Sequence, residues 1–227
     1  MLKRLATATL FMLALAGCAA APVRTEPVHG IVMETLQGGV NVSLTSPAGK
    51  IGGNGVLFYQ RPESFRLSIL SPFGQVLMDI IVNGDRILCL RESLKKGWQG
   101  EMRDLPDSLG VRVWPLMKWA VEPSQPAGPA LERVFTRPDG TFEKVQYDSS
   151  GLVRSKVNAF GDEVVYGDYQ ISGDVAVPTR IGINTPEGSR LQLRLDEPEV
   201  NRPIESEIFE PKLEGYEILP LSEFKEF

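Results

Sequence analysis

The sequence predicts a mainly β protein in which one long antiparallel meander of strands curls around an apolar face. Apolar and polar residues alternate in many short segments, most regularly in Arg190–Asp196, and this two-residue period is typical of strands with one wet side. Turn-forming sequences such as Asn83-Gly84-Asp85 and Ser172-Gly173-Asp174 separate the segments. An open sheet of this size would leave its apolar face bare, so the meander must curl or close.

The first 17 residues have the features of a signal peptide and are not part of this sheet. Lys3 and Arg4 precede an apolar run, 5–16, which is shorter than the roughly 20 residues that a membrane-spanning helix needs. The run ends in Leu15-Ala16-Gly17-Cys18, which resembles the lipobox of bacterial lipoproteins. We therefore expect cleavage before Cys18 and lipid on its sulfur, which would anchor the mature protein to a membrane. The alternative is an ordinary secretory signal followed by a chance cysteine.

The segment after the lipobox bears on location. Ala19 stands where inner-membrane lipoproteins tend to carry Asp, so the same resemblance favours the outer membrane, on its periplasmic face. We expect residues 18–38 to form a lipidated linker that runs into a short helix. Cleavage removes two basic residues and no acidic one, which changes the net charge from −5 to −7. An acidic surface argues against nucleic acid or anionic headgroups as the main partner.

The strands are expected within a single domain at 39–200, because about 210 mature residues suffice for one well-filled sandwich or barrel. Residues 201–227 form an acidic C-terminal extension that either wraps the surface or frays. Eleven strands are predicted, at 40–46, 53–60, 65–70, 75–82, 86–91, 131–136, 141–147, 151–159, 163–171, 176–184 and 189–196.

One apolar segment, 104–121, has helical rather than strand periodicity. Pro106-Asp107-Ser108 is a typical helix start, and Leu109, Val113, Leu116 and Met117 share one helix face. Pro115 could divide the segment into two short helices. Its apolar character predicts a plug against the concave side of the curled sheet.

The sequence offers little support for an enzyme. His29 is the single histidine, which excludes any multi-histidine metal site, and its place in the linker close to the anchor argues against a Ser-His-Asp triad. With Cys18 lipidated, Cys89 is the remaining cysteine, and its apolar strand predicts a buried, inert thiol. We expect no cofactor and no metal.

Several segments, taken in order, resemble the LolB family of outer-membrane lipoprotein receptors. The resemblance covers roughly residues 40–200. It is carried by Phe65-Arg66-Leu67-Ser68-Ile69-Leu70-Ser71-Pro72-Phe73-Gly74, then Asn83-Gly84-Asp85, Trp114-Pro115-Leu116-Met117-Lys118-Trp119, Val164-Val165-Tyr166-Gly167-Asp168-Tyr169, and Val177-Pro178 leading to Arg190–Asp196.

This resemblance implies an unclosed half-barrel whose helices cap an apolar cavity for acyl chains of lipoproteins or phospholipids. It also implies a periplasmic carrier protein as the donor, and an apolar side chain, here Phe73, that dips into the membrane. Two departures from the family are the short segment before the first strand and the C-terminal extension. The candidate cavity residues are Phe65, Leu67, Ile69, Met78, Ile80, Trp114, Met117 and Trp119.

Other interpretations remain open at this point. The candidate cavity residues could fill an ordinary core, and Phe73 could fold back onto its own hairpin. A structural or assembly lipoprotein could use the same half-barrel to bind a protein partner or another lipid. The preferred interpretation is a monomeric, lipid-anchored receptor with no nucleic-acid partner.

Overall fold

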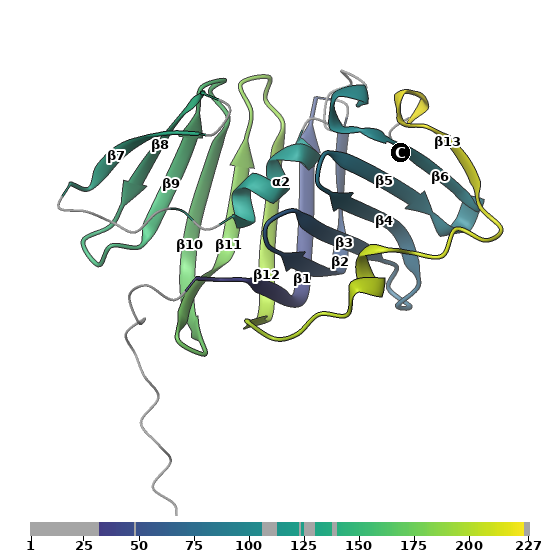
Figure 1. Ribbon diagram of the computed structural model, residues 1–227, viewed down its shortest axis with the longest axis horizontal. Coiled ribbons are helices and arrows are strands. Elements are labelled where there is room, and N and C mark those ends of the chain that lie inside the picture. The colour runs from purple at the N-terminus through teal and green to yellow at the C-terminus, as the bar shows by residue number, and fades with distance from the viewer. Residues whose placement is uncertain are drawn as a thin grey trace, which may run out of the picture.

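The computed structural model describes residues 32–47, 49–105, 113–122, 124, 130–137 and 140–224. Figure 1 shows one strongly twisted sheet with the helix α2 (Val113–Val121) on one face. The strands before α2 are β1 (Thr35–Ser46), β2 (Gly49–Gln60), β3 (Ser64–Leu70), β4 (Val76–Asn83), β5 (Arg86–Arg91) and β6 (Lys96–Glu101). Those after it are β7 (Glu132–Thr136), β8 (Phe142–Tyr147), β9 (Val153–Asn158), β10 (Glu163–Ser172), β11 (Val175–Asn184), β12 (Arg190–Val200) and β13 (Glu217–Pro220).

Short 3-10 helices punctuate the chain at four places in the described residues. They are η1 (Glu92–Leu94), η2 (Met102–Asp104), η3 (Ser206–Phe209) and η4 (Leu221–Glu223).

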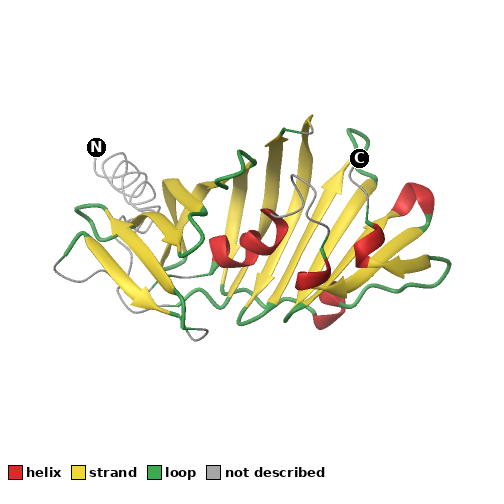
Figure 2. Cartoon of the chain, turned by 90° about the horizontal axis from the view of Figure 1, so that it is seen from above, coloured by secondary structure: helices red, strands yellow, loops and turns green. Residues whose placement is uncertain are grey.

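The sheet is unclosed, as predicted, and consists of two meanders that join in the middle of the sheet. Consecutive strands pair antiparallel from β1 to β6 and again from β7 to β12. The two meanders meet because β1 also pairs antiparallel with β12, with Val42 opposite Leu193. The order is therefore β13-β6-β5-β4-β3-β2-β1-β12-β11-β10-β9-β8-β7, which leaves β13 and β7 as edges. Seen from above, these strands form a single curved layer (Figure 2).

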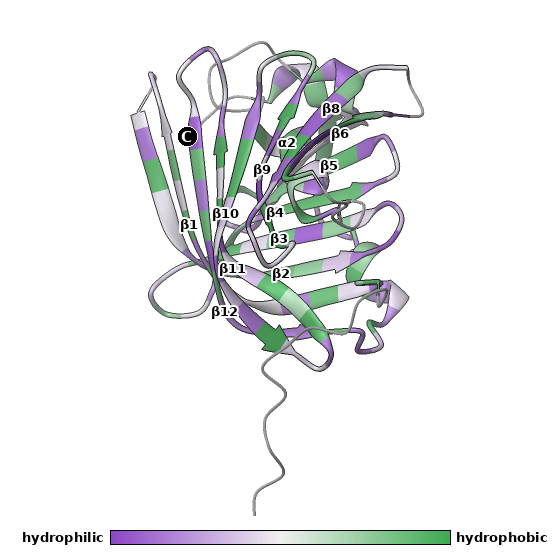
Figure 3. Cartoon of the chain, turned by 90° about the vertical axis from the view of Figure 1, so that its left-hand side faces the viewer, coloured by the Kyte–Doolittle hydropathy of each residue, from purple (hydrophilic) through white to green (hydrophobic). Residues whose placement is uncertain are grey.

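The alternation of residues along the strands gives the sheet two different faces. We call the face whose side chains pack with α2 the inner face, and the opposite one the outer face. Hydrophobic and hydrophilic bands alternate along the strands in Figure 3. In β12, for example, Leu191, Leu193 and Leu195 are buried while Arg190 and Arg194 are exposed. The inner face is thus the apolar one, as the two-residue period predicted.

Two strands were not predicted, β6 and β13. β6 contains one large apolar residue, Trp98, between two glycines, so it lacks the alternation of a half-buried strand. Those glycines make room for the C-terminal segment. A Cβ at Gly97 would lie 2.7 Å from Ile218, and one at Gly100 would lie 2.7 Å from Leu221.

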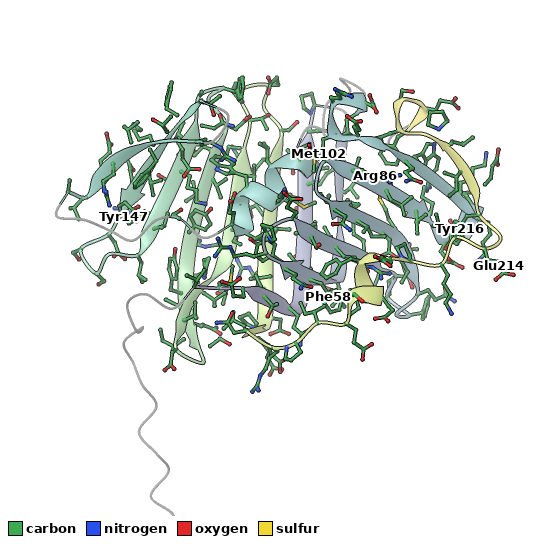
Figure 4. All side chains as sticks on the ribbon, viewed as in Figure 1. Phe58, Arg86, Met102, Tyr147, Glu214 and Tyr216 are labelled. Atoms are coloured by element: carbon green, nitrogen blue, oxygen red, sulfur yellow. The ribbon has the colours of Figure 1, made fainter. Side chains whose placement is uncertain are left out.

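The C-terminal extension does not fray within its described residues but wraps from the outer face to the inner face. On the outer face, Phe209 of η3 is buried, and the Ile208 carbonyl accepts a hydrogen bond of 2.7 Å from Arg66. The chain then passes the sheet edge, where β13 pairs in parallel with β6 and where Tyr216 is seen in Figure 4. It finally returns to the inner face, where the ring of Phe224 meets Trp98 edge-on at 5.3 Å.

Two expectations near the ends of elements need correction. The short helix expected toward the end of the segment 18–38 does not include residues 32–38, because residues 32–34 are not helical and β1 begins at Thr35. The remainder of that segment, the signal peptide and Cys18 lie outside the described residues. The helix α2 is continuous, and Pro115 does not divide it, because a proline in the first turn removes no intrahelical hydrogen bond.

Candidate functional site

The residues predicted to contact lipid are brought together on the inner face. They come from β3, β4 and α2, and they belong to one apolar cluster that joins the sheet to the helix. The side chain of Trp114 lies outside the described part of the structure. Phe65, Leu67, Met78, Ile80 and Met117 have no exposed surface, and Ile69 and Trp119 are 6% exposed. The cluster has the apolar character that an acyl-chain site requires, and contact of these residues with lipid stays a prediction.

The C-terminal end of α2 is held to the sheet by two polar side chains. Lys156 of β9 donates hydrogen bonds from Nζ to the carbonyl of Glu122 at 2.7 Å and to that of Trp119 at 3.3 Å. Tyr166 of β10 donates from its hydroxyl to the carbonyl of Ala120 at 2.7 Å. The last carbonyls of a helix have no intrahelical partner, so these contacts satisfy them. The positive charge of the ammonium also interacts favourably with the negative end of the helix dipole.

Lys156 is buried in an aromatic and acidic environment. Its residue is 2% exposed, and burial lowers the pKa of its ammonium to about 8, against the charges of Glu143 and Glu122 that raise it. The rings of Trp119 and Tyr166 lie 5.9 and 5.7 Å from Nζ. The indole Nε1 of Trp119 donates to Glu143 in turn. Sequence analysis missed this group, although Lys156 stands at a position of β9 that faces inward opposite Val164 and Val145.

Tyr59 of β2 presents the opposite situation, a buried hydroxyl with no hydrogen-bond partner in the described part of the chain. The residue has no exposed surface and belongs to the inner-face cluster. Burial, together with the nearby carboxylate of Glu122, raises the pKa of its hydroxyl to about 12. Sequence analysis did not single out Tyr59, because nothing in a strand pattern distinguishes a bonded hydroxyl from an unbonded one.

Phe73 projects from the turn between β3 and β4. Its side chain is 90% exposed, so it does not fold back onto its own hairpin. The turn is closed internally: the amide of Gly74 donates to the carbonyl of Ser71, and the amide of Ser71 donates to the carbonyl of Gln75. Ser71 Oγ also accepts from the amides of Phe73 and Gln75. Gly74, at φ +78°, suits this turn because a side chain there would be strained.

The turn between β9 and β10 has the same hydrogen bonds and also carries an exposed phenylalanine. Asn158 takes the place of Ser71, and Phe160, 75% exposed, precedes Gly161. The β8–β9 turn repeats the pattern with exposed Ser150 before Gly151. The same turn geometry therefore accommodates a polar residue at this position, and the fold does not require a phenylalanine at position 73.

Other reactive groups are few in the described part of the chain. Cys89 is a buried free thiol, and burial raises the pKa of its sulfur to about 12, so it has the inert character expected of it. No cluster of three or more potential metal ligands occurs among the described residues, and His29 lies outside them. No helix in the described ranges is both long and apolar enough to cross a membrane.

Comparison with solved structures supports the half-barrel. The chain is similar to a domain from Vibrio parahaemolyticus described as an outer membrane lipoprotein-sorting protein domain, with a TM-score of 0.50, 7% identity, and coverage of 78% of this chain and 89% of that one. A DUF1329 family protein from Desulfovibrio piger has a TM-score of 0.52 and 8% identity, with coverage of 78% and 90%. At such low identity these likenesses show the fold alone.

Sequence comparison identifies the family of the chain, which comparison of folds at low identity does not. No curated protein sequence matches it. The family model of the outer membrane lipoprotein LolB matches residues 36–197, which begin in β1 and end in β12 and so span the sheet apart from β13. The match covers more than half of the chain and includes Phe73, Tyr59 and α2. The chain therefore belongs to the LolB family.

Proposed function

We propose that this protein is a lipid-anchored receptor that accepts the acyl chains of lipoproteins on its inner face and delivers them to the outer membrane. The observation that carries the proposal is the continuous apolar inner face beneath α2 in a member of the LolB family. Acyl chains cannot cross an aqueous compartment exposed, and a dry apolar surface shields them. The donor is a periplasmic carrier protein, and transfer needs only a higher affinity in the receiving site.

The anchor at Cys18 and the tip at Phe73 would have complementary roles. Lipid on Cys18 keeps the receptor beside the membrane, on its periplasmic face. Phe73 then enters the interface, where burying its side chain is worth roughly 1.5–3 kcal/mol. The turn that carries it has its backbone groups bonded internally, which lowers the cost of leaving water. The receptor acts as a monomer, without cofactor or metal.

The binding role is tested with the full chain carrying Cys18→Ser, so that its own lipid does not compete. Native mass spectrometry should detect co-purified phospholipid or acylated peptide, and a fluorescent fatty-acid ester should bind with saturation. A protein that is empty and takes up no probe would refute the acyl-binding role and leave the protein-partner alternative. Depletion in cells should strand other lipoproteins in the periplasm or inner membrane, and normal sorting would refute the receptor role.

The role of Phe73 is tested by Phe73→Ser, with Phe160→Ser as the matched control in the same turn geometry. We expect Phe73→Ser to slow transfer of an acylated lipoprotein into vesicles by about tenfold, from the loss of about 1.5 kcal/mol of interfacial binding. Phe160→Ser should leave the rate within twofold of wild type. Equal rates for wild type and Phe73→Ser would exclude the membrane-contact role.

A further inference from the structure

The unpartnered hydroxyl of Tyr59 points to a feature of the bound molecule. More than nine in ten buried polar groups in proteins have a hydrogen-bond partner, and leaving one without carries a free-energy penalty. Tyr59 Oη has no partner among the residues that the structure describes, although the residue is completely buried. Its neighbours across the sheet are Leu36 on β1 and Phe65 on β3, and both are buried apolar residues of the inner-face cluster.

The other polar groups near the end of α2 do not meet this need. Lys156 and Tyr166 are donors, and each is engaged with a helix carbonyl. Glu122 acts on Tyr59 electrostatically but accepts no hydrogen bond from it. A second buried hydroxyl without a partner, that of Ser124, lies two residues after Glu122. Free hydrogen-bonding capacity thus lies on the inner face and in the segment that follows α2.

The charges around Tyr59 favour some ligands over others as acceptors of a hydrogen bond from its hydroxyl. Glu122 and Glu34 act on the hydroxyl as negative charges, and Arg61 as the opposing positive one. An ionised fatty-acid carboxylate would be repelled by this net negative field. A neutral carbonyl accepts a hydrogen bond without adding charge, and it sits at the head of every ester- or amide-linked acyl chain. With its pKa raised, Tyr59 remains a neutral donor at physiological pH.

We propose that Tyr59 Oη donates a hydrogen bond to the ester or amide carbonyl at the head of an acyl chain bound on the inner face. This inference rests on the proposed acyl-binding function and adds the chemical class of ligand: a chain linked through a neutral carbonyl, as on a lipidated cysteine or a glycerolipid. The hydrocarbon lies along the apolar cluster, and the carbonyl meets the Tyr59 hydroxyl, which is buried on the inner face and has no hydrogen-bond partner among the described residues.

The test compares a lipid that has these carbonyls with one that lacks them. Binding of dioctanoyl phosphatidylcholine, whose headgroup has no net charge, and of its dioctyl ether analogue to the full chain carrying Cys18→Ser is measured by calorimetry. Wild type should prefer the ester by about 3- to 10-fold, the size of one net hydrogen bond. Tyr59→Phe should abolish this preference while leaving the affinity for the ether unchanged within twofold.

Tyr169→Phe is the matched control, because the Tyr169 hydroxyl is already bonded to the carbonyl of Val153 at 2.6 Å. It should lower the melting temperature and keep the ester preference. Tyr59→Phe, which removes an unbonded hydroxyl, should not lower the melting temperature. An equal affinity of wild type for ester and ether, or a preference that survives in Tyr59→Phe, would overturn the inference while the acyl-binding function stands. If wild type binds neither lipid, the proposed function fails and the role of Tyr59 fails with it.

Discussion

Replacement of Lys156 by methionine tests how the end of α2 is held. Methionine has nearly the same length and no charge, so it keeps the packing beneath the helix and removes the ammonium. In the wild type, the folded protein binds the proton of Lys156 less tightly than the unfolded chain does, because burial lowers its pKa from 10.5 to about 8. Between these two values the unfolded state carries more protons, and stability rises with pH.

The size of the effect follows from the same two pKa values. Each pKa unit corresponds to about 1.4 kcal/mol. Raising the pH from 7 to 9.5 should therefore increase the contribution of Lys156 to the free energy of unfolding by about 2 kcal/mol. Glu143, Glu122 and Arg137, whose charges act on Lys156, remain in the variant. The pH range ends below 10, where the buried tyrosines begin to favour the unfolded state because their pKa values are raised in the folded one.

The assay is urea unfolding followed by tryptophan fluorescence, at pH 7 and at pH 9.5, for wild type and Lys156→Met. The difference in unfolding free energy, wild type minus variant, should increase by about 2 kcal/mol between the two pH values. Lys144→Met on neighbouring β8 is the control, because Lys144 is 40% exposed and pairs only loosely with Glu132 at 3.7 Å. If the free energy of unfolding changes with pH in the same way for wild type and Lys156→Met, Lys156 is not a buried group with a lowered pKa.

Three further substitutions test the sheet and its C-terminal segment by chemical denaturation. Phe209→Ala should destabilise the fold by about 3 kcal/mol, because it removes the buried side chain that η3 places on the outer face; a change below 1 kcal/mol would mean that this segment is not docked. Arg66→Ala should cost about 3 kcal/mol, because it leaves Asp79 buried without the partner that now lies 2.7 Å away, and an unchanged midpoint would argue against that ion pair. Gly55→Ala should lower the denaturation midpoint measurably, since its Cβ would clash with the carbonyl oxygen of Ser68, and a variant as stable as wild type would contradict the close approach of β2 and β3.

The candidate site was predictable where it depends on a local pattern. Phe65, Leu67 and Ile69 alternate with polar residues, and the structure buries all three on one face. The exposed position of Phe73 follows from a Pro-Phe-Gly turn between two strands, and the structure shows that exposure. Lys156 and Tyr59 were not predictable, because their character depends on which groups from distant segments surround them.

Tertiary contacts also decided which weakly patterned segments became strands. β13 pairs with β6, about 120 positions earlier in the chain, and neither has the alternation that marks a half-buried strand. Gly97 and Gly100 are needed because Ile218 and Leu221 pack against them in the folded chain, and this contact cannot be read from the local sequence. Pairing across such a distance is invisible to a local pattern.

The sequence by itself determined the fold class, the approximate place of eleven strands and the apolar character of one face, because side-chain alternation is a property of neighbouring residues. Only the tertiary structure decided that β1 and β12 join the two meanders, that the C-terminal segment wraps one edge, and which inner-face polar groups are bonded. The physical reason is that strand pairing, burial and hydrogen-bond satisfaction depend on residues that meet only after the chain has folded.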